Sequence, residues 1–316
     1  MTMPVTSLTV EGVLRQLYAG GELDLPLPGS GQTLQRWTTL AEIASRDLVL
    51  ARLAEGHADA IAILHELQSP AKQGIWGVWA AEPPSMRVEA KRTREGWFLT
   101  GRKAWCSGAE FLDHALITAH ADDGRRLFAV ETVYVKAVPD SWPAVGMQAS
   151  GTLSVDLADA PAEAVGVPMA YLERPGFWHG GGGVAACWFG GALGAARFLL
   201  EAVRGGRDDP HALAHLGAVD ANISQLWLHL EAAAAQIDAD PLGGGARLRS
   251  QRLRASVEVG ATEVLERVGR ALGAGPLCQD PAHAHRVADL TVYLRQSHAE
   301  RDLAGLGELA ATEATW

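Results

Sequence analysis

The sequence has few cysteines, and this limits how the chain can be stabilised. Among 316 residues only Cys106, Cys187 and Cys278 are cysteine, and no two of them form a Cys-x-x-Cys pair. Three cysteines cannot all pair within one chain, and a chain of this length can bury enough surface to fold without cross-links. The scarcity excludes a disulfide scaffold and predicts a reduced, cytoplasmic setting.

Basic residues are outnumbered by acidic ones. The chain has 27 Lys and Arg against 37 Asp and Glu, for a net charge of −10. Affinity for nucleic acids and anionic membranes requires an excess of cations, so neither is an expected partner. The opening residues, MTMPVTSL, lack the basic start and apolar centre of a signal peptide. No uninterrupted apolar run reaches the length of a membrane span, so a membrane is again not expected as a partner.

Several common catalytic motifs are also missing. The glycine run 180–183 is not followed by Lys-Ser/Thr, so it is not a phosphate-binding loop. No Gly-x-Gly-x-x-Gly follows an expected strand, and no Gly-x-Ser-x-Gly is present. His211 and His215 have helical spacing for a metal, but they lack the Glu of a metalloprotease motif and a third ligand. We therefore predict no metal site.

What the sequence does contain is a change of periodicity along the chain. Residues 1–73 carry apolar stripes of helical period, including one from Leu40 to Ala51. Residues 74–170 carry short apolar runs separated by Gly, Pro and Asp, which is typical of a barrel or sandwich. Residues 175–316 return to helical stripes. The four helices expected there cover 184–202, 216–237, 246–272 and 283–306, with the glycine run 180–183 as a break. The expected fold is α+β and multidomain, with a helical N-terminal domain, a middle antiparallel β-barrel and a C-terminal four-helix bundle.

The segment FLTGRKAWCSGA, residues 98–109, carries the clearest functional pattern. The expected structure is a strand, a tight turn at Thr100-Gly101 and a second strand. Side chains in a strand repeat with period two, so Trp105 and Ser107 are expected on one face. A flat indole beside a hydroxyl suits a planar heteroaromatic ligand. The alternative is an ordinary core tryptophan on a hairpin.

This segment also resembles the central domain of the acyl-CoA dehydrogenase family. The family pattern Asn-Gly-x-Lys-x-Trp-Ile-Thr/Ser-Asn/Gly-Ala is kept at Gly101, Lys103, Trp105, Ser107, Gly108 and Ala109. The order of helices, barrel and bundle is that of the family as well. The resemblance implies an FAD cofactor, with Trp105, Cys106 and Ser107 packed against the flavin.

Further matches extend the resemblance on both sides of this segment. Trp79-Ala80-Ala81-Glu82-Pro83 resembles the family's strand ending in Thr-Glu-Pro, which implies cofactor contacts at Ala81 and Ser85, although the glycines of the family loop are missing. Residues 146–152, GMQASGT, resemble the family's Gly-x-Arg-x-Ser-x-Thr strand. Gly273, Ala274 and Gly275 match a segment that meets the adenosine half of a neighbouring subunit's FAD, which implies a homodimer or homotetramer. Gly-Ala-Gly is also an ordinary end to a helix.

The family's catalytic glutamate has no counterpart in the sequence. One family position for it falls on Ser297-His298-Ala299, and the other falls on the helix segment 183–188, which contains no carboxylate. His298 is the candidate catalytic residue, because histidine exchanges protons near neutral pH. The alternative is that His298, Glu300, Arg301 and Asp302 form a solvated helix face with charge pairs.

Three functions remain open from the sequence. The first is an acyl-CoA dehydrogenase-like, FAD-dependent oxidoreductase acting on an acyl-CoA or another small molecule. The second is a flavin-dependent monooxygenase of the same fold that uses His298. The third is a degenerate relative that has lost catalysis and acts as a binding or assembly partner.

Overall fold

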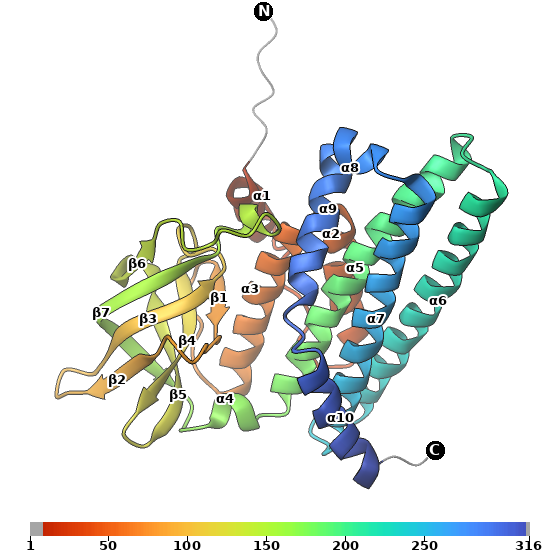
Figure 1. Ribbon diagram of the computed structural model, residues 1–316. Coiled ribbons are helices and arrows are strands. Elements are labelled where there is room, and N and C mark those ends of the chain that lie inside the picture. The colour runs from red at the N-terminus through yellow and green to blue at the C-terminus, as the bar shows by residue number, and fades with distance from the viewer. Residues whose placement is uncertain (1–8, 314–316) are drawn as a thin grey trace, which may run out of the picture. The chain divides into compact units, whose positions relative to one another are not determined.

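The computed structural model describes residues 9–313, which form a mixture of helices and strands (Figure 1). Residues 1–8 and 314–316, at the outer ends of the first and last predicted domains, lie outside the described residues. The chain divides into two compact units. The barrel unit comprises the described residues up to Leu25, together with Gly56–Pro143 and Ala149–Glu173. The helical unit comprises Pro26–Glu55, Ala144–Gln148 and the described residues from Arg174 onward.

The barrel unit is built on a small closed barrel. Its strands are β1 (Trp76–Trp79), β2 (Val88–Arg92), β3 (Trp97–Cys106), β4 (His114–Ala121), β5 (Gly124–Glu131), β6 (Val135–Val138) and β7 (Leu153–Val165). The order β4-β2-β3-β7-β5 closes through pairing of β5 with β4, while β1 adds to β4 and β6 adds to β7. The expectation of an all-antiparallel barrel was wrong, because β1 and β2 both run parallel to β4. Along the chain, the β2–β3 hairpin lies between β1 and β4. This connection allows β4 to run in the same direction as β1.

Strand β3 corrects the predicted turn at Thr100-Gly101. The strand is continuous through Gly101, where its register against β7 shifts. Gly101 has φ +131°, and a Cβ atom there would lie 2.3 Å from the carbonyl oxygen of Arg87. The glycine therefore serves a bulge in which two backbones approach closely. The hairpin turn falls earlier, where the Thr93 amide donates to the Gly96 carbonyl over 2.8 Å.

Helices complete the barrel unit. They are α1 (Val10–Ala19), the second half of α3 (Leu48–Glu66) and the short α4 (Ala170–Glu173). The second half of α3 contributes Ala60, Ile63 and Leu64 to an apolar cluster with barrel side chains. The barrel members of this cluster are Trp76, Leu116, Leu127 and Val165, all of which are almost completely buried.

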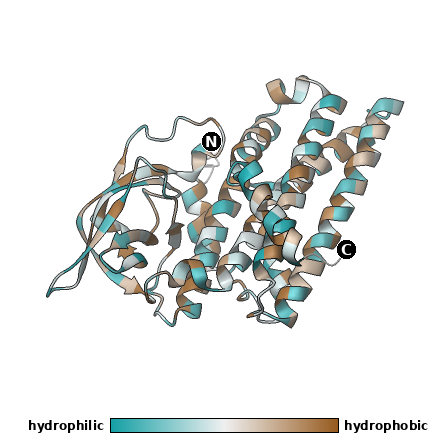
Figure 2. Cartoon of the chain, turned by 60° about the horizontal axis from the view of Figure 1, so that its bottom comes forward, coloured by the Kyte–Doolittle hydropathy of each residue, from teal (hydrophilic) through white to brown (hydrophobic). Residues whose placement is uncertain are grey.

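The helical unit contains α2 and the long helices of the C-terminal half. Their bounds are α2 (Thr33–Arg46), α5 (Gly176–Arg204), α6 (Pro210–Ala239), α7 (Ala246–Leu272), α8 (Gly275–Gln279), α9 (Pro281–Leu294) and α10 (Glu300–Glu313). Helix α5 is central, since it packs against α2, α6, α7 and α9. The long helices carry hydrophobic and hydrophilic residues along their whole length (Figure 2).

Helix α5 corrects the expectation of a break in the glycine run. The predicted break at residues 180–183 lies inside the helix, which begins at Gly176. A Cβ atom on Gly182 would lie 2.4 Å from Cζ2 of Trp37, so close packing with α2 explains the glycine there better than a break does. Among the described residues α5 is also the one helix long and apolar enough to cross a membrane. Most of its apolar window is buried inside the structure, as in the core helix of a folded domain.

Two other predicted helices are interrupted. The stripe from Leu40 to Ala51 spans α2 and α3, which separate at Asp47, and the Asp47 carboxylate accepts from the Leu50 amide at the start of α3. The predicted final helix, 283–306, is divided into α9 and α10 by residues 295–299. Here the Ser297 hydroxyl accepts from the Ala299 amide and turns the chain into α10.

Candidate functional site

The side chain of Trp105 stands out from the surface of the barrel unit. Trp105 has φ +57°, in the left-handed region that a bulky residue rarely adopts, and 56% of its surface is exposed. The register of β3 against β7 shifts between Lys103 and Cys106, on either side of this residue. The bulge therefore holds a large indole outward on a strand whose other residues are fixed by pairing, which provides a surface for stacking.

Two residues after Trp105, Ser107 ends a hydrogen-bonded series of three hydroxyl groups. Thr152 Oγ1 donates to Ser107 Oγ over 3.1 Å, and Ser150 Oγ lies 2.6 Å from Thr152 Oγ1. Thr152 has one hydroxyl proton, which it gives to Ser107, so Ser150 must be the donor to Thr152. Within residues 9–313 no acceptor takes the hydroxyl proton of Ser107 itself, which leaves Ser107 able to donate to a ligand.

The backbone around Ser107 is fixed from two directions. Trp79 Nε1, at the end of β1, donates to the Ser107 carbonyl over 3.0 Å. The amides of Gly108 and Ala109 donate to the carbonyls of Ser150 and Gly151 over 2.9 and 3.1 Å. Ser107 lies just beyond the end of β3, so the period-two argument that paired it with Trp105 does not apply; the turn and its bonds position it instead.

The other predicted cofactor contacts of the barrel unit occupy different environments. Cys106 is completely buried, its Sγ lies 3.6 Å from the carbonyl oxygens of Lys103 and Ala104, and burial raises the pKa of its thiol far above the usual range. This leaves only backbone atoms of Cys106 for a ligand. Ala81 is half-buried, and Ser85 is exposed in the turn that the Met86 amide closes onto the Pro83 carbonyl.

A buried charged cluster that sequence reasoning missed supports this end of the barrel. Lys103 is 2% exposed, and its Nζ donates to Thr118 Oγ1 (2.7 Å), the Thr118 carbonyl (2.8 Å) and Glu82 Oε1 (3.3 Å). Arg125 Nε and His120 Nε2 lie 3.1 and 3.3 Å from the same Glu82 carboxylate. The cluster ties the loop after β1 to strands β3, β4 and β5.

The pKa values of this cluster follow from burial and charge. Burial lowers the pKa of Lys103 to about 8, against the opposing charge and hydrogen bond of Glu82. Burial alone would raise the pKa of Glu82, but the hydrogen bond from Thr118 and the charges of Lys103 and Arg125 lower it. The Lys in the quoted family pattern was the available signal, and its partners could not be assigned without the fold.

Comparisons with known proteins were made for the whole chain. No protein-family model matches it. L-evernosamine nitrososynthase from Micromonospora sp. is 40% identical over 75 residues, which span 22% of this chain and 18% of that relative. The chain therefore matches well under two thirds of this relative's length.

Similar solved structures cover almost the whole chain. TdsC, a dibenzothiophene monooxygenase from Paenibacillus sp. A11-2 solved with FMN and indole, gives a TM-score of 0.83 at 18% identity, over 95% of this chain and 90% of its own. A nitrososynthase from Micromonospora carbonacea var. africana gives 0.79 at 20% identity, over 97% and 90%. The chain has the acyl-CoA dehydrogenase-like fold.

A flavin fits the residues that this acyl-CoA dehydrogenase-like chain presents at Trp105. The exposed indole offers a flat face to a ring system, and the unengaged Ser107 proton offers a donor to the carbonyl and nitrogen acceptors at the ring's edge. The residues that would hold the ring are therefore Trp105 and Ser107, with Thr152 and Ser150 orienting the Ser107 hydroxyl. Neither Ser150 nor Thr152 was predicted as a site residue, although both stand in the segment 146–152 that resembles a family strand.

The segment predicted to meet adenosine is an open helix end. Gly273 follows α7 with φ +69°, and its amide donates to the Gly269 carbonyl. Gly273, Ala274 and Gly275 are all exposed, and a Cβ atom on either glycine would meet nothing within 4 Å. The C-terminal cap accounts for Gly273 within the helical unit.

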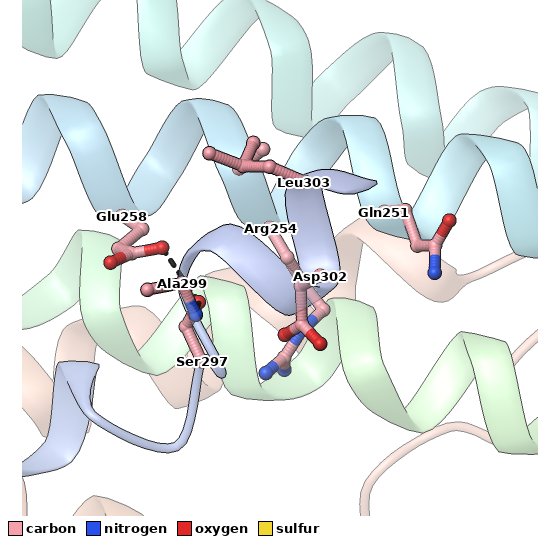
Figure 3. A pocket seen from close by; sticks show the side chains of 8 residues that line it. Gln251, Arg254, Glu258, Ser297, Ala299, Asp302 and Leu303 are labelled. Atoms are coloured by element: carbon pink, nitrogen blue, oxygen red, sulfur yellow. Dashed lines mark hydrogen bonds between the residues drawn. The ribbon is translucent and has the colours of Figure 1, made fainter. Parts of the chain in front are cut away.

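His298 lies in the loop before α10 and not on a helix as expected. Its side chain is 67% exposed, and its Nδ1 lies 3.3 Å from Asp302 Oδ1. The contact between residues 298 and 302 anticipated for a solvated face is therefore present. The same loop lies beside Glu258, a carboxylate on α7 that sequence reasoning also missed, whose Oε2 accepts from Ser297 Oγ over 2.7 Å (Figure 3).

Glu258 and the α5 segment 183–188 do not replace the missing family glutamate. Glu258 is occupied by Ser297 and by Arg295, whose Nη2 lies 2.7 Å from Oε1. The α5 segment 183–188 contains no carboxylate, and most of its residues are buried. Across residues 9–313, no group of three His, Cys, Asp or Glu side chains is placed to hold a metal ion.

Proposed function

We propose that this protein is a flavin-dependent monooxygenase with FMN bound against Trp105. The observation that carries the proposal is the exposed indole of Trp105, held outward by a left-handed backbone, two residues before Ser107, whose hydroxyl retains a proton to donate. Folding alone gives no reason to fix a tryptophan in this way, because exposure forgoes the burial that usually stabilises it. Stacking on a ring system explains the arrangement.

FMN suits the chain better than the FAD expected from the sequence. The similar TdsC structure is described with FMN. The segment assigned to adenosine, residues 273–275, is explained by the end of α7 and needs no nucleotide. FMN lacks the adenosine half, so the proposal removes the need for a contact there.

Oxygen transfer suits the residues better than removal of an α-proton. Proton abstraction from an acyl-CoA needs a positioned base worth about 10²–10⁴ in rate, and the two family positions for it carry no carboxylate. When bound and reduced, the flavin supplies the activation of oxygen. The barrel unit's own contribution is to bind the ring at Trp105 and Ser107. In the helical unit, we propose His298 as the group that gives or takes a proton.

Amino compounds are the first substrate class to test. The sequence relative bears the name of an amine and of a nitrososynthase, so a nitrogen atom is the acceptor of oxygen that its name suggests. We propose the same acceptor class for this chain. The similar structure of a dibenzothiophene monooxygenase makes sulfur compounds the next class to test.

The test separates the two oxidoreductase functions by what reacts with the flavin. Under anaerobic conditions, the FMN-loaded protein is mixed with straight-chain acyl-CoAs, and the proposal predicts no bleaching of the flavin absorbance. With FMN reduced by a separate reductase, ¹⁸O₂ and a panel of amino sugars and indole, it predicts ¹⁸O in an organic product.

Two outcomes would overturn the proposal. Bleaching by an acyl-CoA would identify a dehydrogenase. A protein that takes up neither FMN nor FAD would favour the third function expected from the sequence, a degenerate relative that acts by binding.

A further inference from the structure

The loop of residues 295–299, called the His298 loop here, is held in place by side chains from α7. Glu258 binds both Arg295 and Ser297 over 2.7 Å, and Arg254 Nη2 donates to the Gln296 carbonyl over 3.4 Å. Ser297 in turn accepts from the Ala299 amide over 3.2 Å. These contacts anchor the loop before and after His298, so the histidine sits on a fixed backbone.

The residue after His298 has an unusual backbone. Ala299 has φ +47°, in the left-handed region that favours glycine, so its backbone is strained. Surrounding contacts must hold it there. Strain of this kind is concentrated at functional sites, so it marks the His298 loop for attention beyond its role as a connection.

Asp302, one turn into α10, contacts His298 twice. Its Oδ2 accepts from the His298 backbone amide over 3.0 Å, and its Oδ1 lies 3.3 Å from the ring Nδ1. The backbone contact fixes where the carboxylate sits relative to the ring. A carboxylate at Nδ1 stabilises the tautomer with a proton on that nitrogen and leaves Nε2 as the nitrogen that exchanges protons.

Arg254 adds a positive charge near Asp302. The two side chains border a cavity of about 20 Å³ between α7 and the start of α10, together with Glu258, Ser297 and Leu303 (Figure 3). Attraction to Asp302 counteracts the lowering of the Arg254 pKa by burial. Asp302 therefore has both the Arg254 guanidinium and the His298 imidazole in its surroundings.

We propose that Asp302 is a positioning residue for His298: it selects the Nδ1–H tautomer and so presents Nε2, in its unprotonated form, as the proton acceptor of the reaction. The inference rests on the proposed function for the role of His298. The tautomer, however, is a property of the protein alone and is measurable without flavin or substrate.

The first test is the tautomer of His298 in the unmodified protein. Long-range ¹H–¹⁵N correlation spectra, assigned with a His298→Gln variant, distinguish Nδ1–H from Nε2–H at a pH where the ring is neutral. We expect Nδ1–H for His298. Nε2–H would overturn the proposal, whether or not the protein proves to be a monooxygenase.

Asp302→Asn provides the second test. Asn retains an oxygen that accepts from the His298 amide, so the loop is expected to keep its fold, but the amide cannot replace the charge at Nδ1. We expect a shift of His298 toward Nε2–H, and a loss of oxygenated product of about tenfold, within the ~10²–10⁴ that a general acid–base group contributes. FMN affinity should stay unchanged.

Glu300→Gln is the matched control, since it removes a negative charge two residues away. It should leave the His298 tautomer and the rate of product formation as they are. An equal loss of oxygenated product in both variants, with no change of tautomer in Asp302→Asn, would show that the rate depends only on surface charge. This result would contradict the positioning role. Failure of the unmodified protein to take up FMN would instead count against the proposed function alone.

Discussion

Two residues, Trp105 and Ser107, concentrate the functional signal of this chain. Trp105 is exposed on a left-handed backbone, and Ser107 ends a series of hydroxyl groups that leaves its own proton available. The first feature carries a cost in backbone strain that folding alone does not explain, and the second leaves a donor for a ligand. Binding of a ring system accounts for both.

A double-mutant cycle tests the hydroxyl series. Ser107→Ala should weaken FMN binding by about 1 kcal/mol, close to fivefold, because one hydrogen bond to the ligand is lost. Thr152→Val, which keeps the shape of the side chain, should weaken it by less, because Thr152 only orients Ser107. In the Ser107→Ala background, Thr152→Val should have no further effect, as measured by FMN fluorescence titration. Additive losses would show that Thr152 meets the ligand independently.

Sequence reasoning found Trp105 and Ser107 but not their partners. The family-like segment around Trp105 is contiguous, so its pattern can be read directly. The bonds of Ser107 to Thr152 and of Lys103 to Glu82 join residues 45 and 21 positions apart. Such pairs depend on strand register, which the sequence leaves undetermined once bulges at Gly101 and near Trp105 interrupt the period of two.

Among the secondary-structure elements, α5 illustrates how packing overrides local propensity. Its glycines would weaken an isolated helix, and the run at 180–183 was expected to end it. In the structure these residues are helical, and other glycines of α5 let α2 approach its backbone. A Cβ atom on Gly190 would lie 2.3 Å from the Ala41 carbonyl oxygen. Close approach to α2 therefore accounts for glycine at this position.

Gly190→Ala should destabilise the protein by about 1–3 kcal/mol, because the added methyl group meets backbone that cannot rotate away. The matched control is Gly217→Ala, at an exposed position of α6 where the new atom has nothing within 4 Å. This variant should stabilise the protein by up to about 1 kcal/mol. Urea unfolding measures both. Destabilisation by the Gly217 variant, or none by the Gly190 variant, would contradict the packing of α5 against α2.

For the whole molecule, the buried Lys103 predicts how stability changes with pH. Its pKa falls from 10.5 to about 8 on folding, so between these values the unfolded chain binds a proton that the folded protein has released. Raising the pH then favours the folded state. Relative to a Lys103→Met variant, the unmodified protein should gain up to about 3 kcal/mol of unfolding free energy from pH 8 to 10.5.

The control for this prediction is Lys72→Met. Lys72 is exposed, and its pKa is raised by hydrogen bonds to Glu163 and Glu131. Its removal should therefore leave the change of unfolding free energy with pH as it is over the same range. Urea unfolding at pH 7.5, 9 and 10 gives the comparison. A constant difference between the unmodified protein and Lys103→Met would show that Lys103 keeps an ordinary pKa in the fold.

The chain as a whole has the acyl-CoA dehydrogenase-like fold that its sequence resembled, and the similar TdsC and nitrososynthase structures extend along nearly all of it. The choice between dehydrogenase and monooxygenase was left open by the sequence, because it rests on residues that are absent. His298 lies in a loop, and Glu258 on α7 is engaged by Arg295 and Ser297, so neither supplies the family's helix-borne carboxylate base.

Titration of FMN into the unmodified protein and into Trp105→Ala tests the central claim most directly. Stacking on an aromatic side chain is worth about 1–3 kcal/mol, so the variant should bind FMN at least about fivefold more weakly and lose the quenching of flavin fluorescence. Tyr134→Ala removes another half-exposed aromatic residue of the barrel unit and should bind FMN normally. Equal affinity and quenching in the unmodified protein and Trp105→Ala would contradict the proposed site.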